Sequence, residues 1–115
     1  MKYVLLIYQD ELALQKMPKE EMGKLNADYR AFGEAIQKSG QLILSQGLAP
    51  THSATTVRLR DGKTLTTDGP FAETKEQLGS VYIIEAKDLD DAIRVASSIP
   101  SARFGSIEVR PVWGQ

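Results

Sequence analysis

The sequence predicts a mixed α+β fold in which two strand-helix-strand units share one antiparallel sheet. Residues 2–9 are apolar at nearly every position, as in a central strand covered on both faces. A helical pattern and a second strand-like run follow, and the same order recurs from residue 78 onward. Between the two units, Asp61-Gly62 joins two short alternating runs and predicts a β-hairpin. This order predicts a ferredoxin-like sheet with both helices on one face.

The first helix is predicted over residues 18–39. Its apolar residues recur at spacings of three and four, which places them on one helix face: Met22, Leu25, Tyr29, Phe32 and Ile36. Pro18 suits the first turn, and Gly40 suits the end of the helix. Residues 10–16 form a polar stretch before this helix, without a regular element.

The second helix follows Asp88, which is expected to cap it, with Asp91 at the third helical position as a variant of the capping box. Its expected buried stripe consists of Leu89, Ala92, Ile93, Ala96 and Ile99. Further strands are expected at residues 41–48, 55–60, 63–67, 78–85 and 107–112. The hairpin of residues 55–67 has one polar face, so we expect it at a sheet edge.

Length and composition exclude several classes of protein. The 115 residues fit one domain, residues 1–115, and the net charge of −1 without a basic stripe argues against direct nucleic-acid binding. There is no Cys and only one His, so we expect no disulfide, no metal site and no cofactor. The apolar start is too short to span a membrane, and we expect a cytoplasmic protein.

The predicted sheet has one face without helices. Apolar residues on both sides of its strands indicate that something covers that face, and a second copy of the same sheet is the simplest cover. We therefore expect a homodimer.

One segment, Thr67-Asp68-Gly69-Pro70-Phe71-Ala72-Glu73-Thr74-Lys75-Glu76, carries more than a turn requires. Together with the opening Met1-Lys2-Tyr3-Val4-Leu5-Leu6-Ile7-Tyr8 and the closing Glu108-Val109-Arg110-Pro111-Val112, it resembles the DGPF-type branch of the YCII-related family over nearly the whole chain. The resemblance implies a ferredoxin-like fold, a dimeric α/β-barrel-like pairing of sheets, and a link to sigma-factor transcription systems through a protein partner.

The resemblance also implies a place for chemistry. In the broader family a His on the first helix and an Asp are proposed as an active-site pair. Here the first helix carries no His, and the equivalent place falls near Tyr29.

Asp68 and His52 are the candidate catalytic residues. A carboxylate at a strand end can act as a general base, and histidine is the side-chain type best suited to acid/base chemistry near neutral pH. Two structural alternatives remain open: Asp68 can simply accept backbone N–H bonds in its turn, and a lone loop His is often only solvated.

The candidate ligand-binding residues are Arg58, Phe71, Glu73, Lys75 and Tyr82. An Arg grips carboxylate or phosphate, and Glu73 and Lys75 would share one side of an extended segment. The alternatives are that the charges form a solvated edge and that the aromatic rings pack in the core or at a dimer seam.

Two functions therefore remain open. One is a small-molecule site, enzymatic or not, in a carboxylate-containing cleft between the sheet and the hairpin. The other is a non-catalytic dimerisation or regulatory module of a transcription system. Dinucleotide fingerprints, P-loops and nucleophile elbows are absent from the sequence.

Overall fold

The computed structural model describes residues 1–115. In chain order its elements are β1 (Lys2–Gln9), α1 (Glu11–Gln15), α2 (Lys19–Lys38), β2 (Leu42–Gly47), the 3₁₀ turn η1 (Thr51–Ser53), β3 (Thr55–Arg60), β4 (Lys63–Asp68), β5 (Gln77–Glu85), α3 (Leu89–Ser97), the 3₁₀ turn η2 (Pro100–Arg103) and β6 (Ser106–Pro111). A four-stranded antiparallel sheet has the order β2-β5-β1-β6, and β3 pairs with β4 in a separate sheet. The strand order agrees with the ferredoxin-like fold.

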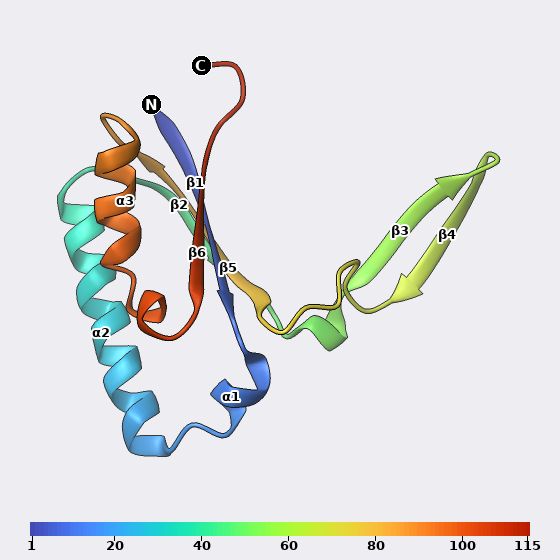
Figure 1. Ribbon diagram of the computed structural model, residues 1–115, viewed down its shortest axis with the longest axis horizontal. Helices are drawn as coiled ribbons and strands as arrows, with labels where there is room; N and C mark the ends of the chain where they lie inside the picture. Colours follow the sequence, from blue (N-terminus) through green and yellow to red (C-terminus); the bar gives the residue numbers. More distant parts are fainter.

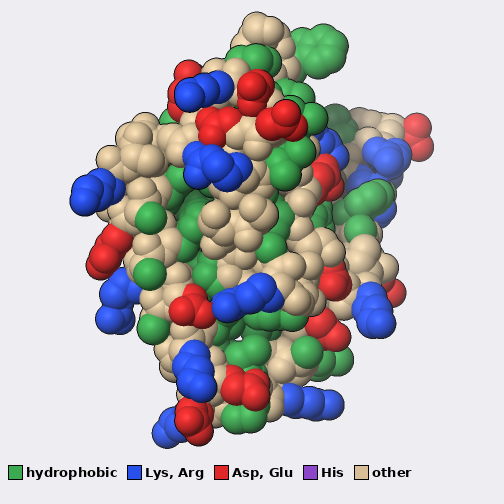
Figure 2. All heavy atoms as spheres, turned by 60° about the vertical axis from the view of Figure 1, so that its left-hand side comes forward, with side chains coloured by type: hydrophobic (Ala, Val, Ile, Leu, Met, Phe, Trp, Pro, Cys, Tyr) green, Lys and Arg blue, Asp and Glu red, His purple; other side chains and the backbone are tan.

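The two long helices, α2 and α3, cover one face of the four-stranded sheet (Figure 1). Tyr3, Leu5 and Ile7 of the central strand β1 point into this layer and are buried. The Phe32 and Tyr82 rings meet edge to face, with 5.6 Å between their centroids. On the outer side, hydrophobic side chains show in the band between the helices and charged ones surround it (Figure 2).

The opposite face of the sheet carries no helix (Figure 1). The register places Val4 and Leu6 of β1 on this open face beside Ile83 and Val81 of β5. Leu44 of β2 extends the apolar surface, and Glu108 and Arg110 of β6 border it. The four residues of β1 and β5 on this face are only half-buried, and Leu44 is exposed.

The β3–β4 hairpin projects from the body as an arm (Figure 1), so the expectation that it lies at an edge of the main sheet is wrong. Its turn is the predicted one: Asp61 and Gly62 both have positive φ, 51° and 73°, as a type I′ turn requires. The polar face that suggested a sheet edge instead belongs to a ribbon that is exposed on both faces.

The helices agree with prediction except in three details. Leu89 and Ile93 are exposed, because α3 packs through Ala92, Val95 and Ala96, a stripe rotated from the expected one. The stretch after β1 holds a short helix, α1, which was not predicted; the Asp10 side chain caps it by accepting from the Leu12 and Ala13 N–H groups.

The third detail concerns the start of α3. Asp88 caps the helix by accepting the Asp91 N–H at 2.9 Å, as predicted. The Asp91 carboxylate reaches the Lys87 N–H at 3.0 Å rather than the capping residue. That hydrogen bond and the Arg94 guanidinium lower the pKa of Asp91.

None of the helices is long and apolar enough to cross a bilayer.

Candidate functional site

The segment after β4 joins the arm to the body. Gly69 has φ +99°, a conformation that residues with a Cβ rarely adopt. Its N–H donates to the Ala54 carbonyl at 2.7 Å, and its own carbonyl accepts from Thr56 Oγ1 at 2.9 Å. These two bonds tie the start of β3 to the end of β4, so the chain enters and leaves the arm at one point.

Small-molecule sites typically have volumes of about 300–1,000 Å³. A hollow of 430 Å³ lies beside this junction. Its lining comes from η1 and from the segment before β5: Thr51, Pro70, Ala72, Glu73, Thr74 and Gln77. Glu73 is the one charged residue of that set. The hollow is therefore bounded by the motif that the sequence singles out and by the turn that precedes the arm.

The polar groups of this hollow are arranged as hydrogen-bond acceptors. Thr51 Oγ1 donates to Glu11 Oε2 at 2.8 Å, and Thr74 Oγ1 donates to the Glu76 carbonyl. Each hydroxyl has thereby used its only hydrogen and keeps lone pairs. Gln77 is engaged in part: its Oε1 accepts the Glu11 N–H at 2.9 Å, and its Nε2 donates one of its two hydrogens to the Thr74 carbonyl.

Comparison with known proteins decides the family. The YCII-related domain matches residues 1–114. The uncharacterized protein R00369 of Rhizobium meliloti (strain 1021) is 40% identical over 114 residues, which cover 97% of this chain and 92% of that protein. The chain belongs to the YCII-related family.

In this YCII-related domain the two candidate catalytic residues lie outside the lining of the hollow. Asp68 is exposed at the end of β4, and the bonds of Thr56 and Gly69 fix the turn after it. His52 is exposed in η1, next to the lining residue Thr51. Both residues are near the lining in sequence but are not part of it, whereas the predicted residue Glu73 lines the hollow.

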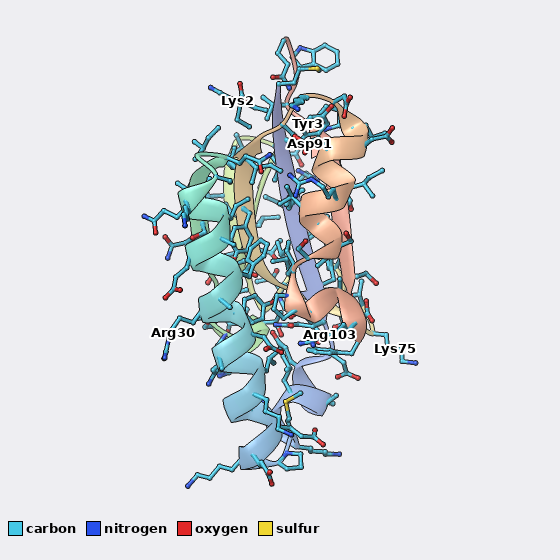
Figure 3. All side chains as sticks on the ribbon, turned by 90° about the vertical axis from the view of Figure 1, so that its left-hand side faces the viewer. Lys2, Tyr3, Arg30, Lys75, Asp91 and Arg103 are labelled. Atoms are coloured by element: carbon cyan, nitrogen blue, oxygen red, sulfur yellow. The ribbon has the colours of Figure 1, made fainter.

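The remaining candidate residues fall in three places. Arg58 lies over the Phe71 ring at 5.3 Å from the centroid, on the arm side of the junction, and Phe71 is 76% exposed. Lys75 points away from the body (Figure 3). Tyr82 packs on Phe32 beneath the helices, on the face of the sheet opposite the open one.

A polar network under α2 was not predicted from the sequence. Ser101 is fully buried; its hydroxyl donates to Gln9 Oε1 at 2.8 Å and shares a hydrogen bond with the Tyr29 hydroxyl. Arg103, next along η2, pairs with Asp28 at 2.8 Å, on the helical side of the body (Figure 3). The only sequence signal near this network is the run Ser101-Ala102-Arg103 after Pro100, and such a run has the ordinary composition of a loop.

Burial raises the pKa of Tyr29, and the Ser101 hydrogen bonds and the Arg103 charge oppose this in part. Burial likewise raises the pKa of Tyr82. The Tyr29 hydroxyl is therefore a neutral group, held by the buried Ser101 side chain. The structure holds no group of three His, Asp or Glu side chains arranged to bind a metal ion.

Proposed function

We propose that this YCII-related domain binds a small molecule that carries an amine or several other N–H or O–H donors, in the hollow beside the arm. The observation that carries the proposal is the set of polar groups that line it: the Glu73 carboxylate and two threonine hydroxyls whose hydrogens are already engaged. A ligand that offered only acceptors would leave these groups unpaired, at a cost in binding free energy.

Glu73 is the anchor of the proposed ligand, because a carboxylate forms charge-assisted hydrogen bonds with a protonated amine. His52 follows the lining residue Thr51 and Asp68 precedes Pro70 by two positions, so these two are the groups that would exchange protons in an enzymatic version of the site. Asp68→Asn and His52→Gln should leave the affinity unchanged whether the site only binds its ligand or also converts it. In an enzymatic site the same substitutions should also abolish turnover.

The test is a titration of ¹⁵N-labelled protein with a panel of primary amines, amidines, neutral polyols and carboxylic acids. Amines are expected to shift the amide signals of residues 70–77, and Glu73→Gln is expected to weaken binding by roughly tenfold, the loss of one charge-assisted bond. Glu20→Gln is the matched control, since Glu20 is an exposed carboxylate on α2. Preferred binding of carboxylic acids, or equal affinity in Glu73→Gln and wild type, would contradict the proposal.

We also propose that two copies pair through the open face of the four-stranded sheet. Support comes from the unpartnered apolar surface of Val4, Leu6, Val81, Ile83 and Leu44, which water would otherwise cover. A purely regulatory dimer that serves a transcription partner has the same surface in its favour. It differs in predicting no small-molecule response at residues 70–77. Leu6→Glu should dissociate the pair, and an unchanged mass in light scattering would refute the pairing.

A further inference from the structure

The β3–β4 arm has no hydrophobic core of its own. It is one hairpin of two six-residue strands, and every residue of β4 and all but one of β3 are exposed. A two-stranded hairpin is at best marginally stable in water and needs a surface to pack against. The body of the same chain does not provide one, because the arm leads away from it (Figure 1).

The two faces of the arm differ in character. Val57 and Leu59 lie on one face, opposite Thr66 and Thr64 of β4, and are 62% and 66% exposed. The other face holds three cations and one apolar residue, because Arg60 pairs with Lys63 and Arg58 pairs with Leu65, which is 50% exposed. The charged face suits water, so the face of Val57 and Leu59 is the one that gains by burial.

The area that the chain leaves exposed fits a partner of its own size. A folded monomer of this mass exposes about 6,200 Å², whereas this chain exposes 8179 Å². The excess of about 1,900 Å² is within the range that each copy of an obligate homodimer buries. The radius of gyration, 16.1 Å, also exceeds the roughly 13 Å of a compact chain of this length.

We infer that each arm packs its Val57–Leu59 face on a second copy of the chain, so that the homodimer is clasped by two exchanged arms. The inference rests on the pairing through the open sheet face that is proposed above. Each copy offers one arm and receives one, so two-fold symmetry closes the assembly and leaves no arm free. The Gly69 junction, with its bonds to Ala54 and Thr56, sets the direction in which the arm leaves.

The first test compares Leu59→Glu with Leu12→Glu by sedimentation equilibrium. Leu12 on α1 is the matched control, because it is also 66% exposed but lies outside the arm. Leu59→Glu is expected to raise the dimer dissociation constant roughly 100-fold, since symmetry brings one carboxylate from each copy into an apolar contact. Leu12→Glu is expected to match wild type.

The second test detects the contact directly and does not rely on a substitution that disrupts the dimer. A photoreactive benzoylphenylalanine is placed at position 59 in one preparation and at position 12 in another, and both are irradiated. Position 59 is expected to give a covalent dimer whose peptide map joins the arm to the other copy, identified with isotope-labelled partner chains. Position 12 is expected to give monomer only.

The outcomes separate the two proposals. A dimeric wild type in which Leu59→Glu behaves like Leu12→Glu, with no cross-link from position 59, overturns the exchanged arm and leaves the sheet pairing intact. A wild type that is monomeric at every concentration overturns both. Cross-links from position 59 to its own chain also overturn the exchange, because they mean that the arm folds back.

Discussion

The hydroxyl groups of Tyr29 and Ser101, 72 positions apart, share a hydrogen bond that ties α2 to η2 beneath the helical layer. Ser101 also donates to Gln9 at the end of β1, so one buried side chain links three separate parts of the fold. The polar groups of this network are engaged with one another, which suits a structural role.

Ser101→Ala should lower the free energy of unfolding by about 1–3 kcal/mol, because the Tyr29 hydroxyl and the Gln9 amide lose their buried partner. Urea denaturation measures the change. Ser97→Ala is the control, since that hydroxyl is exposed and bonds only within α3, and it should alter stability by less than about 0.5 kcal/mol. Equal effects of the two substitutions would show that the network does not stabilise the fold.

Alkaline pH should destabilise the protein through Tyr29 and Tyr82. Their folded-state pKa values are raised above 10.0 by burial, so the unfolded chain ionises first as pH rises. The stabilisation is fully present below pH 10 and is lost as pH passes through the folded-state values. Absorbance at 295 nm should show two tyrosines ionising late. A wild-type titration that coincides with that of the Tyr29→Phe/Tyr82→Phe double variant, apart from its amplitude, would contradict this.

Gly105→Ala should destabilise the fold, since a Cβ there would stand 2.3 Å from the Tyr8 carbonyl oxygen, and backbone must move to admit it. The expected loss is about 1–3 kcal/mol, as for other overpacked sites. Gly33→Ala in α2 is the opposite case: no atom lies within 4 Å of the new methyl group. It should gain up to about 1 kcal/mol from helix propensity. Thermal unfolding should separate the two variants in opposite directions from wild type.

Gly69→Ala should strain the junction of the arm, because φ +99° disfavours any residue with a Cβ. We expect a loss of about 1–2 kcal/mol in urea denaturation, the cost of a non-glycine residue in this region. Gly47→Ala in β2 has open space and no positive φ, and serves as the control. A Gly69→Ala protein as stable as Gly47→Ala would mean that the junction relaxes without cost.

Local patterns in the sequence predicted most of the fold. Spacings of three and four among Leu25, Tyr29, Phe32 and Ile36 predicted α2, and Asp61-Gly62 predicted the hairpin turn, because both patterns depend on neighbouring residues alone. The predicted position of the hairpin was wrong. Alternation along a strand indicates which face is polar, but it does not indicate which element packs against that face. The orientation of α3 likewise depends on the sheet beneath it, which exposes Leu89 and Ile93.

The candidate site was predicted only in part. The motif of residues 67–76 includes Glu73, which lines the hollow, whereas Asp68, Phe71 and Lys75 of the same motif do not. Thr51 and Gln77 were missed because their roles arise from contacts with Glu11, 40 and 66 positions away in the sequence. The Gln9, Ser101 and Tyr29 network has the same origin, since each residue taken alone has an ordinary composition for its element.

The junction at Ala54 and Gly69 also bears on how the arm can change in length. Because the chain enters and leaves at one hydrogen-bonded pair, residues can be added to or removed from the hairpin without moving β2 or β5. Adding one residue to each strand, that is one cross-strand pair or rung, moves every residue beyond the insertion to the opposite face of the ribbon. Adding two such pairs returns those residues to their original face. Relatives with longer or shorter arms should therefore differ by whole pairs of rungs, and an odd change should come with an exchange of apolar and charged residues along the ribbon.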